Sequence, residues 1–174
     1  MKKIGIIGAG ISGLVLACLL KQNTDYNISI FEKDEIETKN INGIQISPNA
    51  VRILKKLKFS LFDQSKLCKI KGLSFYDYNS NSIIARMNFN FLGNEDYITL
   101  NRNELINFLI SKFSLKNQII KKEVTKISGK SIFFKNNDYE NFDILIIADG
   151  IFSKLRYQKI HPVYSGYSAF RGIL

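Results

Sequence analysis

A glycine-rich loop near the start of the chain is the first feature that could do chemistry: Gly8-Ala9-Gly10-Ile11-Ser12-Gly13. It follows a short apolar run, Ile4 to Ile7, and precedes a stretch typical of a helix that ends near Lys21. Between a strand and a helix, the first glycine makes the tight turn, the second lets a pyrophosphate approach the backbone, and the third allows close packing. The N–H groups that begin the helix then face the phosphates. The loop predicts a dinucleotide site that uses Gly8, Gly10, Ile11, Ser12 and Gly13.

An acidic residue at the end of the next predicted strand supports the prediction of a dinucleotide site. The run Asn27 to Phe31 reads as a strand, and Glu32 ends it about 20 positions after the loop, where a carboxylate can accept from ribose hydroxyls. Lys33 follows directly and joins the candidate site. The alternative is that Glu32 is only a solvated strand end. These motifs do not separate an NAD-binding unit from an FAD-binding unit.

The pair Asp149-Gly150 ends a second apolar run, Ile144 to Ala148, and Arg156 follows a few residues later. Asp-Gly is a common turn, so a plain turn is the alternative to a site. A continuously apolar strand is expected in the middle of a parallel sheet. Its carboxyl end is the edge where such folds bind ligands.

Two further candidates lie at predicted helix starts in the middle of the chain. Ser47 and Pro48 suit the cap and first position of a helix to about Lys58, which puts Asn49 in its first turn, facing either a ligand or solvent. Asn101 and Glu104 resemble a capping box. Arg102 would then open that helix, where a cation opposes the helix dipole by roughly 0.3–1 kcal/mol. A cofactor phosphate or a surface carboxylate would offset this cost.

The chain has 174 residues, of which 45% are hydrophobic and 23% charged, as in soluble globular proteins. Its net charge of +10 comes from scattered lysines, which argues against a nucleic-acid face and leaves attraction to an anionic membrane or substrate open. Cys18 and Cys68 lie far apart, which excludes a disulfide scaffold and a zinc site. We expect both thiols to be buried and reduced, as in a cytoplasmic protein, and the single His161 to be structural. No metal site is expected.

The first twenty residues also imitate a lipoprotein signal, with Lys2 and Lys3 before an apolar run that reaches Cys18. The glycine spacing and Glu32 are unexplained by that alternative, so no integral membrane segment is predicted. After the nucleotide-binding start, two-residue periodicity predicts a hairpin of residues 73–76 and 82–86 and a strand at 97–100. Strands follow at 124–127, 131–134 and 142–148. The fold class is therefore α/β, with an antiparallel excursion.

The ordered set of motifs resembles the FAD-dependent aromatic hydroxylases, flavoprotein monooxygenases similar to para-hydroxybenzoate hydroxylase and the ubiquinone-biosynthesis hydroxylases. The set comprises the glycine loop, Glu32, the segment from Gly43 to Ala50, Arg102 and Asp149-Gly150 with Arg156. The resemblance implies that Asp149 and Gly150 lie beside the FAD pyrophosphate, supported by Arg156, and that Arg102 contacts the phosphate or ribityl region. It also implies that NADH or NADPH reduces the flavin, which then forms a hydroperoxide with O₂ and oxygenates an aromatic or quinone-precursor substrate. The cofactor performs this chemistry, so no catalytic side chain is expected.

The resemblance further implies a Rossmann-like FAD-binding domain of the glutathione-reductase type and the start of an incomplete substrate domain. It divides the chain into an FAD-binding βαβ part (1–72), antiparallel substrate-domain strands (73–100), a return to the FAD-binding domain (101–156) and the start of a truncated substrate domain (157–174). Ile147 and the segment Lys39 to Asn42 depart from the family pattern. We expect an N-terminal portion of such an enzyme in the cytoplasm, with peripheral contact at the inner membrane as an open alternative. Its unfinished sheet would favour self-association or a partner chain.

Three alternatives stay open at this point. A related flavin-dependent reductase or halogenase would share the FAD-binding half. A non-catalytic fragment would bind FAD or ADP without turnover. An NAD-dependent dehydrogenase would share the glycine loop, although Arg102 and Asp149-Gly150 argue against it.

Overall fold

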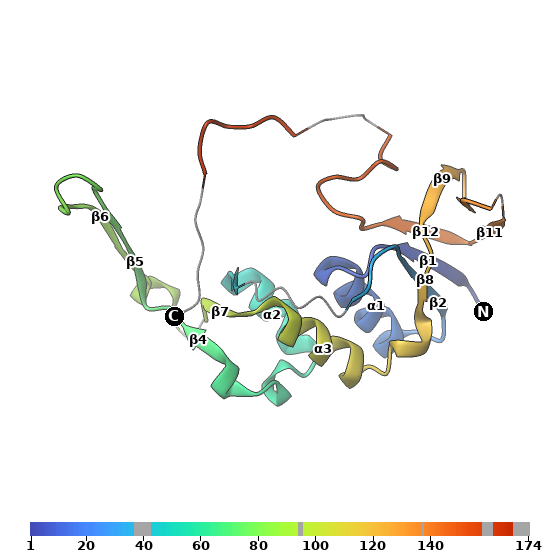
Figure 1. Cartoon of the computed structure of the whole chain (residues 1–174). Coiled ribbons are helices and arrows are strands. Elements are labelled where there is room, and N and C mark those ends of the chain that lie inside the picture. The colour runs from blue at the N-terminus through green and yellow to red at the C-terminus, as the bar shows by residue number, and fades with distance from the viewer. Residues whose placement is uncertain (37–42, 94–95, 137, 158–161, 169–174) are drawn as a thin grey trace. The chain divides into compact units, whose positions relative to one another are not determined.

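The computed structural model describes residues 1–36, 43–93, 96–136, 138–157 and 162–168 (Figure 1). The chain forms two compact units. Unit 1 comprises residues 1–40 and 105–171, and unit 2 comprises residues 41–104 and 172–174. The predicted excursion, 73–100, falls inside unit 2, and the four-part division of the chain stays a prediction.

Unit 1 is built on a parallel sheet of four strands in the order β12-β1-β2-β8. The strands are β1 (Lys3–Ile7), β2 (Asn27–Glu32), β8 (Ile119–Lys121) and β12 (Ile144–Ile147). Both faces of β1 are apolar, since Ile6 on one face is 0% exposed and Ile7 on the other face is 5% exposed. Burial on both faces is what a central parallel strand requires, and β1 accordingly pairs on both sides.

Helix α1 (Ile11–Asn23) packs on one face of this sheet, against β1 and β2. The side chains that α1 buries include Leu14, Ala17 and Cys18. Their positions, i, i+3 and i+4, lie on one face of a helix. Beside it runs α3 (Arg102–Lys112), which belongs to unit 1 from Leu105 onward. The Cys18 thiol lies 3.8 Å from the carbonyl oxygen of Leu109, so the two helices pack closely.

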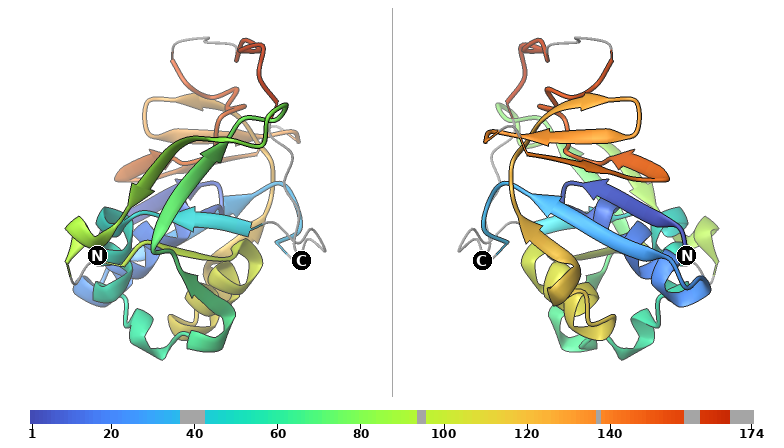
Figure 2. Two further views of the ribbon diagram at one scale, coloured as in Figure 1. Left: turned by 90° about the vertical axis from the view of Figure 1, so that its left-hand side faces the viewer. Right: turned by 90° about the vertical axis from the view of Figure 1, so that its right-hand side faces the viewer.

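An antiparallel meander covers the other face of the sheet (Figure 2). It consists of β9 (Val124–Ser128), β10 (Ser131–Phe134) and β11 (Tyr139–Asn141). Phe31 of the parallel sheet lies at the centre of this contact, with ring centroids 5.5 Å from Phe134 and 5.8 Å from Phe142. Unit 1 is therefore a helix, sheet and meander in three layers.

Unit 2 contains an antiparallel sheet in the order β3-β7-β4 and a separate hairpin, β5–β6. Helix α2 (Pro48–Lys56) buries Val51 and Leu54, and Leu57 follows them into the core. The remaining elements are β3 (Gly43–Ile46), the 3₁₀ turns η1 (Phe59–Leu61) and η2 (Gln64–Lys66), β4 (Leu67–Lys69), β5 (Gly72–Tyr76), β6 (Ile83–Asn88), η3 (Asn90–Leu92) and β7 (Ile98–Asn101).

The predicted place of the last strand is wrong. Strand β12 is the edge of the described sheet rather than its middle, and Ile144 and Ile147 are 40% and 43% exposed. The apolar sequence of β12 is typical of a strand that pairs on both sides. Among the described residues, however, β12 pairs only with β1.

Two smaller predictions also change. Cys68 is exposed, because the three-residue strand β4 turns it to the solvent side. Asn101 does cap α3 by accepting from the Asn103 N–H at 2.8 Å, but the carboxylate of Glu104 accepts from Lys66 Nζ at 2.9 Å. The short strands β3, β4, β8 and β11 escaped prediction. His161 and Lys39 to Asn42 lie outside the described residues.

The two thiols make the packing of α1 testable. Burial raises the pKa of the Cys18 thiol to about 12. Only the thiolate reacts with maleimides, so native protein at pH 8 should be labelled at Cys68 alone, and both thiols should react in urea. The neutral Cys18 thiol stabilises the fold below pH 9, and this contribution is lost as pH rises toward 12. Mass spectrometry of labelled peptides is the measurement, and rapid native labelling of Cys18 would contradict the packing.

Candidate functional site

The glycine loop joins β1 to α1 in the tight form that its spacing predicts. Gly8 has φ +105°, a left-handed backbone that side chains disfavour, and its N–H donates to the carbonyl of Phe31 at 2.8 Å. A Cβ on Gly8 would lie 2.3 Å from the carbonyl oxygen of Ala148. A Cβ on Gly13 would lie 2.1 Å from the carbonyl oxygen of Gly8. Only glycine fits at either position, so these two residues set how closely α1 approaches the sheet.

Gly10 differs from these two glycines. Its φ is −69°, which any residue can adopt, and an added Cβ would meet no atom of the described chain within 4 Å. The space in front of the second glycine is therefore open, as a ligand backbone would require. Gly10 is also the N-cap of α1, where no side chain caps the helix and no acidic residue lies in the first turn. The positive end of the helix dipole is thus available to an anion.

Glu32 is tied to the loop directly. One carboxylate oxygen accepts from the N–H of Ala9 at 2.8 Å, and the other accepts from the N–H of Asp34 at 3.1 Å. A carboxylate has about four lone-pair sites, so ribose hydroxyls can still be accepted beside these two bonds. The residue therefore has two tasks in this geometry: it fixes the loop and it offers acceptors at the end of β2.

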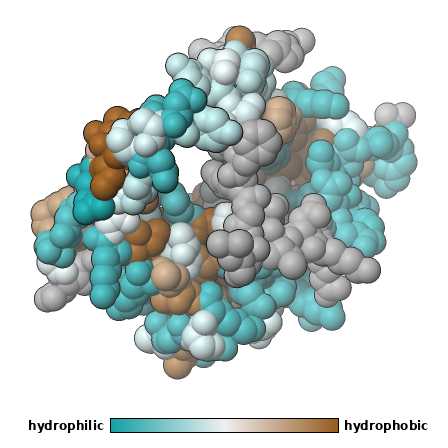
Figure 3. Space-filling view, turned by 60° about the vertical axis from the view of Figure 1, so that its left-hand side comes forward, coloured by the Kyte–Doolittle hydropathy of each residue, from teal (hydrophilic) through white to brown (hydrophobic). Residues whose placement is uncertain are grey.

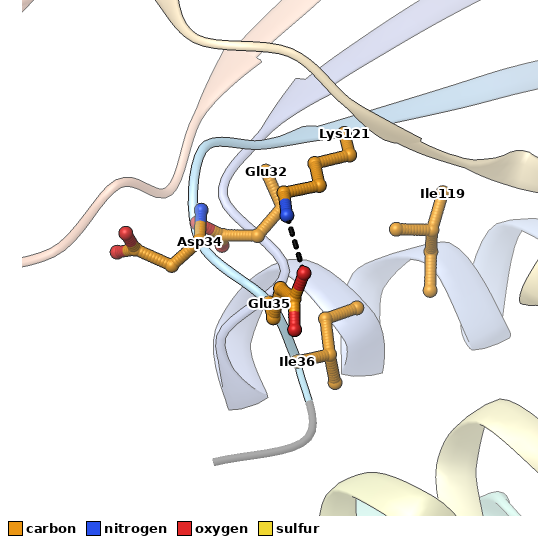
Figure 4. A pocket seen from close by; sticks show the side chains of 6 residues that line it. All are labelled: Glu32, Asp34, Glu35, Ile36, Ile119 and Lys121. Carbon is orange, nitrogen blue, oxygen red and sulfur yellow. Dashed lines mark hydrogen bonds and ion pairs between the residues drawn. The ribbon is translucent and has the colours of Figure 1, made fainter.

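A cavity of about 260 Å³ opens beside Glu32 (Figure 4). It combines apolar walls, Ile36 and Ile119, with an ion pair in which Lys121 Nζ lies 2.6 Å from the Glu35 carboxylate. The hydrogen bond and the charge of Lys121 lower the pKa of Glu35. Sequence reasoning missed this cavity because β8, which supplies Ile119 and Lys121, is only three residues long. The adjacent apolar residues Ile119 and Ile120 were the only sequence feature that indicated strand β8.

The Asp149-Gly150 turn lies against the glycine loop. The N–H of Ala148 donates to the carbonyl of Ile7 at 2.7 Å, and the Cα of Asp149 lies 3.0 Å from where a Gly8 Cβ would be. Gly150 has φ +86°. Arg156 donates to the carbonyls of Gly150 and Ile151 at 3.1 and 2.7 Å. The arginine thus holds the segment that follows the turn, and its guanidinium is engaged with the backbone.

The other three candidates have contacts of their own. Lys33 is exposed and lies 3.9 Å from the Asp34 carboxylate. Asn49 is in the first turn of α2 and accepts from the Ser47 hydroxyl; Ser47 is the N-cap residue of α2, as predicted, but its side chain makes no capping hydrogen bond. Arg102 is the first residue of α3, as predicted, and is half-buried. Asn49 and Arg102 belong to unit 2. The structure therefore brings together the loop, Glu32 and Asp149-Gly150 within unit 1.

Two other features, a membrane-spanning helix and a metal-binding cluster, were sought among the described residues. No described helix has the length and apolar character needed to span a membrane. Within the same residues, no cluster of three or more His, Cys, Asp or Glu side chains is arranged to hold a metal ion.

A parallel sheet, an open glycine loop at the N-terminus of α1 and a carboxylate at the end of β2 are features of the Rossmann-like dinucleotide-binding fold. Residues 6–57 match the family described as the NAD(P)-binding Rossmann-like domain. The predicted fold class is confirmed.

Three of the curated relatives that the chain matches are named as monooxygenases. The chain is 24% identical over 182 residues to 3-amino-4-hydroxybenzoate 2-monooxygenase of Streptomyces cremeus, covering 99% of this chain and 46% of the relative. It is 24% identical over 186 residues to 6-hydroxynicotinate 3-monooxygenase of Pseudomonas fluorescens, covering 98% and 47%. It is 27% identical over 168 residues to the FAD-dependent monooxygenase prhF of Penicillium brasilianum, covering 88% and 34%. The predicted resemblance to FAD-dependent aromatic hydroxylases is confirmed, and the chain spans less than half the length of these relatives.

Solved structures agree on the fold. The crystal structure of 2-methyl-3-hydroxypyridine-5-carboxylic acid oxygenase, in a Y270A variant, superposes with a TM-score of 0.75 at 22% identity. The match covers 90% of this chain and 42% of that one.

Substitutions at Gly10 and Gly13 should have different effects, the first on ADP binding and the second on stability. Gly10→Val should cost the fold about 1 kcal/mol or less, because its Cβ meets open space and the main change is at a helix cap. It should nonetheless weaken ADP binding at least tenfold by filling that space. Gly13→Ala should lower the free energy of unfolding by about 1–3 kcal/mol through overpacking. Calorimetric titration and urea unfolding measure the two effects, and an unchanged ADP affinity in Gly10→Val would contradict the site.

Glu32 should matter to the loop even without a ligand. Glu32→Ala removes a charged acceptor from two N–H groups, so we expect a loss of about 1.5–3 kcal/mol in unfolding free energy. ADP affinity should fall as well. Glu35→Ala is the matched control, because its ion pair with Lys121 is exposed to solvent and adds little to the stability of the fold. Equal urea midpoints for the two variants would show that Glu32 does not fix the loop.

Proposed function

We propose that the chain is the FAD-binding part of an NAD(P)H-dependent monooxygenase that hydroxylates a small aromatic compound. The observation that carries the proposal is the open space at Gly10, in front of a helix N-terminus that has no side-chain cap. The names of the relatives support flavin-dependent oxygenation. Because the chain spans less than half of them, the activity of the whole protein is itself part of the proposal.

The residues of unit 1 suit the adenosine diphosphate half of FAD. The pyrophosphate would lie against Gly8, Gly10 and the N–H groups of Ile11, Ser12 and Gly13. The ribose would bond Glu32, beside the cavity with its apolar walls and Lys121. Asp149 and Gly150 would approach the pyrophosphate from the neighbouring strand end, with Arg156 fixing their segment. Lys33, Asn49 and Arg102 complete the proposed contacts.

When bound, the flavin would supply the redox chemistry: it would accept a hydride from NADH or NADPH and pass electrons to O₂. The protein's part would be to bind, to orient and to exclude water. Two relatives are named for 3-amino-4-hydroxybenzoate and 6-hydroxynicotinate, rings that carry a hydroxyl and a carboxylate. We therefore propose a hydroxylated aromatic acid as the substrate class. We also propose a cytoplasmic location, peripheral membrane contact, and association with a further copy or a partner chain through the unfinished sheet.

A nucleotide panel tests the cofactor. FAD and ADP should bind the purified chain, and FMN should bind at least tenfold more weakly, because it lacks the adenosine monophosphate moiety and therefore has no pyrophosphate and no adenosine ribose. NAD⁺ also contains an ADP half, so comparing it with FAD distinguishes a flavoprotein from an NAD-dependent dehydrogenase, the main alternative. A dehydrogenase would bind NAD⁺ and not FAD, and that result would replace the proposal.

The same preparation then tests turnover. With FAD, NADH or NADPH and a panel of hydroxylated aromatic acids, oxygenated product and H₂O₂ are measured. We expect these 174 residues, tested alone, to produce peroxide without ring hydroxylation, because they match less than half of the relatives' length and water would then reach the flavin. Efficient hydroxylation with little peroxide would show that this chain needs no further part.

A further inference from the structure

The lysines are scattered over the chain as a whole, but one segment of unit 2, from Arg52 to Lys71, is distinctly basic. It contains seven lysine or arginine residues and a single acidic residue, Asp63. The segment runs from α2 through η1 and η2 to β4 and the residues just after it. Charge of one sign gathered in this way produces a positive potential that attracts an anionic partner.

The fold of unit 2 brings several of these cations together. Helix α2 buries its apolar stripe, so Arg52, Lys55 and Lys56 lie on its exposed side. The carboxylate of Asp96 lies 3.7 Å from Lys55 Nζ of α2 and 2.8 Å from Lys69 Nζ of β4. One acidic residue therefore holds cations of the helix and of the strand beside each other.

Lys58 has a backbone conformation that does not suit a lysine. It follows the C-cap of α2, Leu57, and has φ +58°, in the left-handed region. Glycine is the usual residue at this position, because a side chain disfavours positive φ. The Lys58 side chain is exposed, and among the described residues it makes no ion pair. A charge retained in a strained backbone, without a partner in the fold, indicates a role toward something outside it.

The neighbours of these cations favour a lipid surface over a nucleic acid. Ile53 and Leu61 are 44% and 61% exposed. In Figure 3, the surface at the bottom of the view, where η1 and η2 lie, carries hydrophilic side chains with isolated hydrophobic ones among them. Isolated apolar side chains beside cations suit the headgroup region of a bilayer. Phe59 and Phe62, the aromatic residues of the segment, are buried and stacked at 5.1 Å, so neither can stack on a base.

We propose that this part of unit 2 docks on an anionic lipid bilayer. The docking residues, called here the basic surface, are Arg52, Lys55, Lys56, Lys58 and Lys69. Their attraction to anionic headgroups acts within a Debye length and is screened by salt. The proposal rests on the peripheral membrane contact of the proposed function, to which it gives a place on the chain. It does not rest on the cofactor.

The experiment is flotation of the purified 174-residue chain with phosphatidylcholine vesicles that contain or lack phosphatidylglycerol. The chain should bind the anionic vesicles only, and salt should release it. Lys56→Gln should weaken binding about fivefold. Lys58→Gly should weaken binding to the same degree and yet raise the urea midpoint, because glycine relieves the positive φ. A lysine with a purely structural role would not separate these two effects.

Lys126→Gln, in β9 of unit 1, is the matched control, because it removes one exposed positive charge outside the basic surface. It should leave vesicle binding unchanged. All three variants should keep the ADP affinity of the unaltered chain, so the membrane and cofactor proposals can fail separately.

Three results would overturn the proposal. The first is equal binding to vesicles with and without phosphatidylglycerol. The second is equal weakening by Lys56→Gln and Lys126→Gln, which would leave membrane contact but not this surface. The third is tighter binding to a DNA duplex than to the anionic vesicles, which would assign the basic surface to nucleic acid.

Discussion

The contact between Gly13 and the carbonyl oxygen of Gly8 is the constraint on which the rest of the site depends. A Cβ at Gly13 would lie 2.1 Å from that oxygen, so α1 can approach β1 only because the residue is glycine. This approach brings the N-terminus of α1 to the carboxyl edge of the parallel sheet. The proposed phosphate contacts of the loop and of α1 follow from that position, because free N–H groups and the dipole act only within the first turn.

Glu32 extends the same constraint to the next strand. Its bond to the Ala9 N–H joins the end of β2 to the loop after β1, while the Gly8 N–H bonds the Phe31 carbonyl one residue earlier. On the other side, the Ala148 N–H bonds the Ile7 carbonyl and places the Asp149-Gly150 turn next to Gly8. Three neighbouring strands thus end at one place through backbone hydrogen bonds. Pre-ordering of this kind lowers the entropic cost of binding a dinucleotide.

Much of unit 1 could be predicted, because its signals are local. The spacing of Gly8, Gly10 and Gly13 and the buried stripe of α1 follow directly from residue types. The edge position of β12 could not be predicted, because an apolar run reports the burial of a strand and not the number of its neighbours. Strand β8 was missed for its length of three residues, and the cavity beside Lys121 was missed with it. Cys68 shows the same limit, since the burial of a single residue in a short strand depends on its partners.

The most direct test of the central claim, that this loop binds the ADP half of a dinucleotide, is a titration of the ¹⁵N-labelled chain with ADP followed by NMR. The amide signals of Ile11, Ser12 and Gly13 should shift most, together with those of Ala9 and Asp34, which bond Glu32. Signals of the β5–β6 hairpin should stay in place. Saturable shifts that avoid the loop, or no shifts at millimolar ADP, would contradict the claim.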